Sequence, residues 1–186
     1  GELPQLPATE VTVGVMGLGV LGQALARQLS ALRYRVIGYR RGPGGVDGIE
    51  VFHGENQLQA FMRRSMILAL LLPSTPETNR IINSKTLGWL PSDAYLINAG
   101  RGDVVNEQEL IEALDNGPLA GAALDVFERE PLPRESVLWT HPDVYVTPHI
   151  ASITHPPTAC RYIADAINSY RQGGPWPHLV EIERGY

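Results

Sequence analysis

Three charged residues in the second half of the chain have side chains that together could reduce a 2-keto acid. Arg101 stands between two glycines in "GRGD", Glu130 precedes a proline in "EREP", and His149 follows a proline in "VTPH". The reduction needs a cation for the substrate's carboxylate and carbonyl, which the forked guanidinium of Arg101 can supply. It also needs a proton donor, and a histidine is a natural one because a neighbouring carboxylate raises its pKa from about 6.5 toward the working pH.

A fourth polar residue, Asp125, ends the apolar stretch "GAALD". Its carboxylate is an acceptor that could hold the carboxamide of a nicotinamide ring and so orient that ring. Taken singly, each of the four residues is also typical of an ordinary surface loop. A pure scaffold, however, would have no reason to place an arginine, a glutamate and a histidine at three successive strand exits.

Each of these residues follows a short apolar run, and these runs predict the strands that must position the residues. Strands are expected at 11–16, 35–39, 66–72, 94–99, 120–126 and 144–148, and helices at 20–32, about 55–63, 106–116 and 154–172. Apolar runs without polar alternation are typical of strands buried on both faces. We therefore expect an α/β fold with a doubly wound parallel sheet, a Rossmann-like NAD(P)-binding domain, whose ligands bind beyond the carboxyl ends of the strands.

The stretch "GVMGLGVLGQALARQL" predicts where a dinucleotide would bind. It contains Gly17-x-Gly19-x-x-Gly22 directly after an expected strand and at the start of an expected helix. The first glycine permits the tight turn, the second lets the backbone approach a pyrophosphate, and the third allows close packing of helix on strand. Backbone amides near Gly19, Val20 and Leu21 would then face the phosphates at the helix N-terminus.

Two arginines end the second expected strand, in "VIGYRRGPGG", immediately after Tyr39. Arg40 lies 23 residues after Gly17, where an NAD-binding chain carries an acid that accepts from the ribose hydroxyls. A guanidinium cannot accept a hydrogen bond, but it can hold a 2′-phosphate in bidentate fashion. Although an arginine pair in a loop is often a solvated surface feature, the position of Arg40 and Arg41 predicts NADP(H) as the preferred cofactor, with NAD(H) as the lesser one.

The composition of the chain argues against a nucleic-acid-binding protein and against a membrane-spanning one. The chain has 186 residues, a formal net charge of −5 and a single cysteine, Cys160. An acidic balance argues against a nucleic-acid partner, and no apolar window approaches the length of a membrane span. One cysteine fits a reducing compartment, so we expect a cytoplasmic protein, with Cys160 buried in the last helix. The histidines outside the candidate set lack metal-site spacing, so no metal is expected.

The sequence resembles the D-isomer-specific 2-hydroxyacid dehydrogenase family. The motifs that carry the resemblance are "VGVMGLGVLGQALA", "LLLPSTPETNRIIN", "LINAGRGDVVNEQELIEAL", "GAALDVFEREPLP" and "VTPHIAS", which occur in the family's order. The resemblance implies that Arg101, Glu130 and His149 are the catalytic set and that Asp125 orients the nicotinamide. It also implies that further residues line the cofactor, namely Leu72, Pro73, Thr78, Ala99 and Gly100.

Within the family, the chain is most similar to the glyoxylate/hydroxypyruvate reductase A branch. It shares "EREPLP", "ESVLW", the continuation "PHIASITHP" and an ending in "RGY". The branch prefers NADPH, reduces small 2-keto acids and forms homodimers at full length. Family members begin with a separate substrate domain, which we do not find here. We therefore expect residues 1–10 to be a linker, 11–172 the dinucleotide-binding domain, and 173–186 a tail that would return to a missing substrate domain.

Two other functions also fit parts of the sequence. A β-hydroxyacid dehydrogenase also opens with a similar glycine turn but depends on a catalytic lysine, and Lys85 does not follow an expected strand. A dinucleotide-sensing interaction module of the same family is a second alternative, which the sequence alone leaves open. The leading interpretation is a reductase of glyoxylate, hydroxypyruvate or a similar small 2-keto acid, represented by its cofactor domain.

Overall fold

The computed structural model describes residues 6–177 and residue 179. The chain divides into two compact units, Gly1–His149 and Ile150–Tyr186. Residues 1–5 of the expected linker, and residues 178 and 180–186 of the expected tail, lie outside the described part. Within the described part of the linker, Ala8–Glu10 forms a short 3-10 helix.

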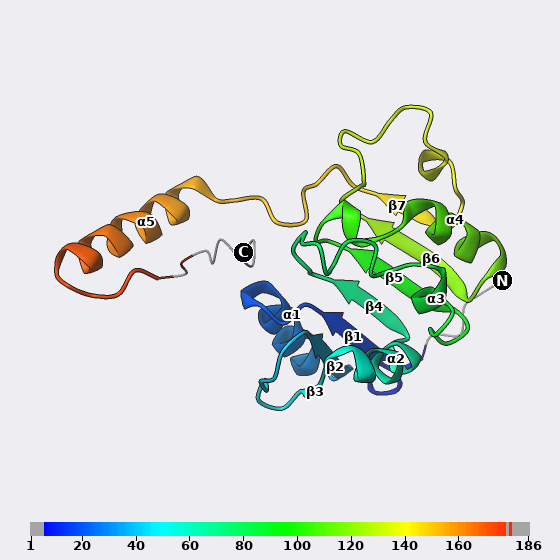
Figure 1. Cartoon of the computed structure of the whole chain (residues 1–186), viewed down its shortest axis with the longest axis horizontal. Coiled ribbons are helices and arrows are strands. Elements are labelled where there is room, and N and C mark those ends of the chain that lie inside the picture. The colour runs from blue at the N-terminus through cyan, green and yellow to red at the C-terminus, as the bar shows by residue number, and fades with distance from the viewer. Residues whose placement is uncertain (1–5, 178, 180–186) are drawn as a thin grey trace. The chain divides into compact units, whose positions relative to one another are not determined.

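The first unit contains one sheet of seven parallel strands in the order β3-β2-β1-β4-β5-β6-β7 (Figure 1). The strands are β1 (Thr12–Met16), β2 (Arg35–Arg40), β3 (Glu50–His53), β4 (Ile67–Leu70), β5 (Ala94–Asn98), β6 (Leu119–Leu124) and β7 (Val144–Val146). The order reverses direction between β1 and β4, which is the topological switch point where such sheets bind ligands. The predicted fold class is confirmed.

Helices lie on both sides of the sheet and each side has its own apolar core, but on one side they cover only part of the sheet. On one face α1 (Val20–Ala31) packs against β1 and β2 through residues such as Ala26. On the other face lie α2 (Glu55–Arg64), α3 (Ser84–Leu87) and α4 (Glu107–Asn116), which bury the larger core around Phe61 and Leu110. Strands at the centre of the sheet are buried from both sides and need apolar side chains throughout, which explains their runs in the sequence, whereas Ile97 on β5 and Tyr145 on β7 are exposed.

The helix expected at 106–116 is α4 (Glu107–Asn116), and residues at both of its ends satisfy backbone groups. The side chain of Asn106 caps the helix by accepting from the amide of Glu109 at 3.3 Å. Gly117 follows the last helical residue and donates its amide to the carbonyl of Ala113. These capping groups satisfy backbone atoms that the helix leaves without internal partners.

One strand and one α-helix of the first unit were not predicted. β3, "EVFH", is an edge strand of four residues whose two ends are exposed polar residues, so it lacks the apolar run that marks the inner strands. α3, "SKTL", is a single helical turn with Asn83 as its cap, which is too short to show a helical period. Both elements are set by their neighbours in the fold rather than by a local pattern.

The second unit consists mainly of α5 (Pro156–Arg171), which starts with proline at its first position. Beyond it, the rings of Tyr170 and Trp176 meet edge to face at 5.4 Å. The prediction that Cys160 is buried was wrong, because its side chain is exposed on α5. Within this unit the helix buries only Ala166. No helix among the described residues is long and apolar enough to span a membrane.

Candidate active site

Parallel strands bring the predicted site residues to one edge of the sheet. The glycine turn follows β1, Leu72 and Pro73 follow β4, and Arg101 follows β5 by three residues. Asp125 directly follows β6, and His149 lies three residues beyond β7. Because these strands all point the same way, their carboxyl ends meet at that edge. The residues were distant in sequence but share one side of the first unit.

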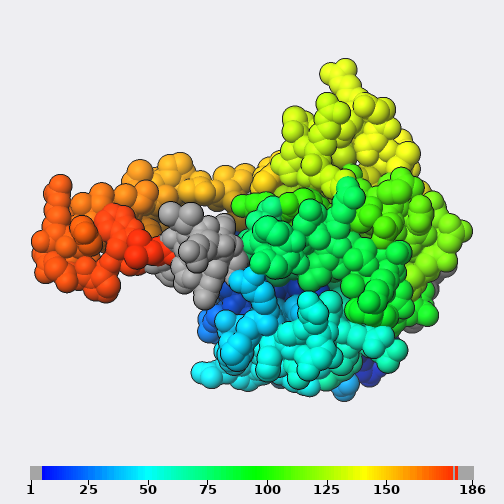
Figure 2. Space-filling model, in the orientation of Figure 1, coloured from blue at the N-terminus to red at the C-terminus, as the bar shows by residue number. Residues whose placement is uncertain are grey.

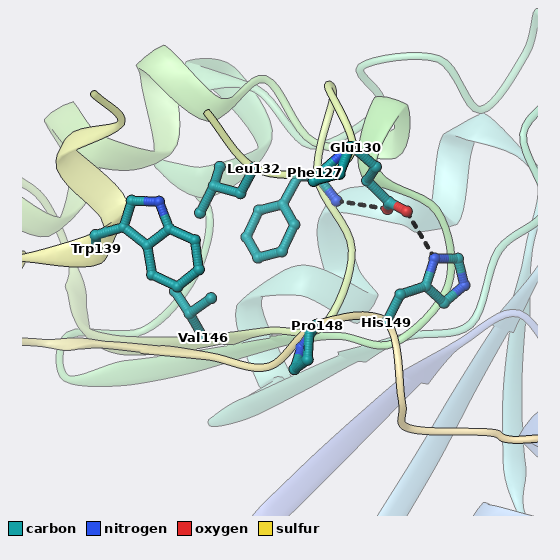
Figure 3. A pocket seen from close by; sticks show the side chains of 8 residues that line it. Phe127, Glu130, Leu132, Trp139, Val146, Pro148 and His149 are labelled. Carbon is teal, nitrogen blue, oxygen red and sulfur yellow. Dashed lines mark hydrogen bonds and ion pairs between the residues drawn. The ribbon is translucent and has the colours of Figure 1, made fainter. Parts of the chain in front are cut away.

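Glu130 and His149 are joined directly (Figure 3). The Nδ1 atom of His149 lies 2.7 Å from Oε2 of Glu130, while Oε1 accepts from the amide of Phe127 at 3.1 Å. Burial alone would raise the pKa of Glu130. The hydrogen bonds from His149 and Phe127, together with the positive charges of His149 and Arg101, outweigh it and hold the pKa of Glu130 below its ordinary value. The carboxylate therefore stays ionised beside the imidazole.

The backbone of His149 is held in a left-handed conformation, with a φ of 55°. Such a conformation is uncommon outside glycine and persists where surrounding contacts fix it. Here the His149 amide donates to the carbonyl of Asp125 at 2.8 Å. The Asp125 side chain, which is buried, accepts a hydrogen bond from the hydroxyl of Thr147. The residue predicted to orient the nicotinamide thus also anchors the histidine.

Arg101 lies in a turn after β5, residues 98–102, which is called the arginine turn below and is held in place by a buried asparagine. The side chain of Asn98, only 1% exposed, accepts from the Gly100 amide at 3.1 Å and donates to the Arg101 carbonyl at 3.0 Å. The carbonyl of Asn98 accepts from the amide of Asp125 at 3.0 Å. One residue at the end of β5 therefore links the arginine turn to the strand that carries Asp125.

Gly102 lets the arginine turn pack against the loop that carries Glu130. A Cβ atom at this position would lie 1.9 Å from the backbone carbon of Phe127, far closer than any real contact. The absence of a side chain at Gly102 thus sets the approach of Arg101 to the Phe127–Glu130 segment. The charge of Arg101 contributes to the lowered pKa of Glu130, as expected from this approach.

The glycine turn after β1 fits the phosphates of a dinucleotide. Gly17 has a φ of 105° and donates its amide to the Tyr39 carbonyl. A Cβ at Gly22 would lie 1.8 Å from the Gly17 carbonyl oxygen, so α1 packs tightly on the turn. A Cβ at Gly19, in contrast, would meet nothing within 4 Å, which leaves room for a ligand beside the backbone. As the cap of α1, Gly19 offers no side chain to its first amides, which suits an anion.

The two arginines after Tyr39 have different environments. Arg40 is half-buried, and a Cβ at Gly44 would lie 2.4 Å from its Nη1 atom, so its guanidinium lies against that loop. Arg41 is exposed, and its Nη1 atom lies 3.4 Å from Oε1 of Glu77 in the segment that follows β4. Arg41 therefore has an acidic partner that the sequence pattern did not indicate.

The remaining predicted cofactor residues differ in what they expose. The Tyr39 ring is buried against Phe61, and its hydroxyl donates to the Gly54 carbonyl at 3.3 Å, so at this edge Tyr39 offers only its backbone. Thr78 donates to the Pro73 carbonyl at 2.6 Å and so closes the loop after β4. Leu72, Pro73 and Ala99 are half-buried at the same edge, whereas Gly100 is buried against the backbone of Leu72. The exposed first residues of α1, Val20 and Leu21, complete the set.

A cavity of 440 Å³ adjoins the Glu130–His149 pair. It lies by the segment between β6 and β7, which projects from the first unit (Figures 1 and 2). Its walls are largely apolar, as Figure 3 shows, and are formed by Phe127, Glu130, Pro131, Leu132, Trp139, Val146, Pro148 and His149. Trp139 is half exposed and donates its indole N–H to the Pro133 carbonyl.

Three supporting residues were missed in the sequence, although two of them carried a signal. Asn98 and Thr147 are polar residues at the ends of otherwise apolar runs, "AYLIN" and "VYVT", and such positions commonly hold a neighbouring loop. Glu77 lies in the expected cofactor-lining stretch "PSTPETN" but shows no local pattern of its own. Only the fold brings it beside Arg41.

Comparisons with known proteins agree with this geometry. Residues 2–151 match the family described as D-isomer specific 2-hydroxyacid dehydrogenase, NAD binding domain. The glyoxylate/hydroxypyruvate reductase A of Escherichia fergusonii is 45% identical over 99% of this chain, and the chain spans 59% of that relative's length.

Two solved structures are also similar. A D-isomer specific 2-hydroxyacid dehydrogenase from Xanthobacter autotrophicus Py2, in complex with NADPH and MES, superposes with a TM-score of 0.94 at 44% identity, covering 100% of this chain and 77% of that one. The NADPH-dependent glyoxylate/hydroxypyruvate reductase of Sinorhizobium meliloti, in complex with NADP and sulfate, gives a TM-score of 0.94 at 41% identity, covering 100% and 60%. The chain therefore belongs to the D-isomer-specific 2-hydroxyacid dehydrogenase family and contains its NAD-binding domain.

Proposed function

We propose that this chain is the cofactor-binding and catalytic part of an NADPH-dependent reductase of glyoxylate, hydroxypyruvate or a similar small 2-keto acid. The observation that carries the proposal is the 2.7 Å contact between His149 and Glu130 at the edge where Arg101 and the glycine turn also lie. Figure 3 shows the other ring nitrogen of His149 pointing away from Glu130, so it remains available to a substrate. The names of the relatives support the same reaction class.

In the proposed reaction each side chain has a separate task. NADPH, when bound, supplies the hydride. Arg101 binds the carboxylate of the keto acid and polarises its carbonyl oxygen, because a guanidinium offers two parallel donors. His149 donates a proton from Nε2 to the oxygen that gains negative charge. Glu130 fixes the orientation of the ring through Nδ1 and stabilises the imidazolium that is present before the transfer.

For cofactor binding, we propose that the amides at Gly19, Val20 and Leu21 hold the pyrophosphate and that Asp125 accepts from the nicotinamide carboxamide. Arg40 and Arg41 are proposed to favour NADP(H) over NAD(H), because no acid at the end of β2 is available to accept from the ribose. Two similar structures that contain NADPH or NADP support this preference.

Assembly and location are further proposals from the family resemblance. We place the dinucleotide-binding domain at 11–172, and we infer that 173–186 would contact a substrate domain outside this chain. A homodimer is proposed for the whole enzyme. It is supported by apolar side chains on the open face of the sheet, since Ile97 is 40% and Tyr145 is 77% exposed. The single cysteine supports a reducing, cytoplasmic location.

A chimeric enzyme tests the proposed reaction. The part of the Escherichia fergusonii relative that lies outside the match would be joined to this chain, and NADPH oxidation would be followed with glyoxylate and with hydroxypyruvate. We expect turnover that depends on the keto acid. A chimera that folds and binds NADPH but oxidises none would contradict the catalytic proposal and favour a dinucleotide-sensing role.

A further inference from the structure

The ion pair between Arg41 and Glu77 joins the segments that follow β2 and β4. These two strands flank β1, which leads to the glycine turn. A dinucleotide bound at the glycine turn extends its adenosine ribose toward the end of β2. The pair therefore lies where the 2′ position of that ribose would be.

Of the two arginines, Arg41 is the one whose acidic partner, Glu77, can be replaced by an anionic ligand. Its side chain is 52% exposed and that of Glu77 is 58% exposed, so water and ligands reach both. Arg40, in contrast, is half-buried against the loop at Gly44. An exposed ion pair contributes little to fold stability, so exchanging one anion for another at Arg41 costs the fold little.

We propose that Glu77 is a specificity-determining residue of the cofactor site, and this inference rests on the proposed function. Without a 2′-phosphate, Glu77 neutralises Arg41. The phosphate of NADP(H) competes with Glu77 for the same guanidinium and is repelled by the carboxylate. NAD(H) has hydroxyls in that place, and a carboxylate accepts hydrogen bonds from hydroxyls. Glu77 thus weakens the preference that the arginines create and lets NAD(H) bind as the lesser cofactor.

Equilibrium titration of the whole chain with NADPH and with NADH tests the inference. Glu77→Gln removes the charge but keeps an oxygen that can accept from ribose hydroxyls. We expect NADPH to bind about three- to tenfold more tightly to this variant, with NADH affinity unchanged within about twofold. The gain should shrink as salt concentration rises, because both side chains are exposed.

Two control variants distinguish competition between Glu77 and the phosphate at Arg41 from a general effect of net charge. Glu112→Gln removes the same charge from an exposed position on α4, and it should leave both affinities unchanged. In an Arg41→Gln background, Glu77→Gln should no longer improve NADPH binding by more than about twofold, since the competition at Arg41 is gone.

The outcomes distinguish this inference from the function on which it rests. If the parent chain binds NADPH more tightly than NADH and Glu77→Gln leaves NADPH affinity unchanged or lower, the role of Glu77 is overturned while the cofactor proposal stands. If Glu112→Gln gives the same gain, net charge rather than Glu77 is responsible and the inference is again overturned. If the folded parent chain binds neither nucleotide, the proposed cofactor itself fails.

Discussion

His149 and Glu130 are 19 residues apart in the chain, yet Nδ1 of the imidazole lies 2.7 Å from Oε2 of the carboxylate. The contact forms because β7 lies beside β6 in the parallel sheet and the loop after β6 turns back over the edge. The amides of Phe127 and His149 are held in the same loops, by Glu130 and by Asp125 respectively. The pair is thus fixed from both of its elements.

Glu130→Gln should lower stability in a pH-dependent way. The pKa of Glu130 is below its ordinary value, so its stabilising contribution is fully present above the ordinary carboxyl range and is lost as pH falls through the lowered pKa. We expect the variant to unfold at lower urea than the parent at pH 7, and the difference to vanish well below about pH 4. A difference that stays constant across this range would show that Glu130 acts through packing instead.

Glu107→Gln should raise stability at pH 7, whereas Glu130→Gln should lower it. Burial, followed by the nearby charge of Glu128, raises the pKa of Glu107. A raised pKa contributes stability that is fully present below the unfolded value and is lost as pH rises through the folded value. The neutral amide still accepts from the Glu128 amide, so we expect higher stability than the parent at pH 7 and no gain below about pH 4. Urea unfolding at both pH values measures this, and a loss at pH 7 would refute it.

Gly102→Ala should separate the arginine turn from the Glu130 loop. The new Cβ would overlap the backbone of Phe127, and overpacking of this kind costs about 1–3 kcal/mol. Gly45→Ala is the matched control, because a Cβ there meets nothing within 4 Å. Thermal unfolding of both variants checks the prediction, which fails if they are equally stable.

Arg41→Gln should weaken NADPH binding about tenfold and change NADH binding by less than about twofold. The reason is that only NADPH carries the phosphate that the guanidinium holds. Arg35→Gln removes the same charge from the other end of β2 and should alter neither affinity. Fluorescence titration of the three chains provides the test, and equal losses for both nucleotides in Arg41→Gln would remove its role in cofactor choice.

The sequence was enough to predict the positions of Arg101, Asp125 and His149 at strand exits, because buried strands show as apolar runs and their ends as the first polar residues. It also predicted the glycine turn, which depends on local backbone requirements. These features involve residues close together in the chain, so their patterns can be read without the fold.

Features that depend on contacts between distant segments were not predictable in this way. The Tyr39 side chain faces the core because of the register of β2, and Glu77 meets Arg41 only through the strand order. The exposure of Cys160 depends on how little α5 buries within its own unit, which its helical pattern does not reveal.

The proton-donor role of His149 is tested most directly in the chimeric enzyme by comparing His149→Gln with the unsubstituted chimera. Glyoxylate-dependent turnover and NADPH affinity would be measured in both. We expect turnover to fall about 10²- to 10⁴-fold while NADPH affinity stays the same, because the imidazole serves the reacting oxygen and not the nucleotide. A loss of less than about tenfold, with NADPH still bound, would contradict proton donation by His149.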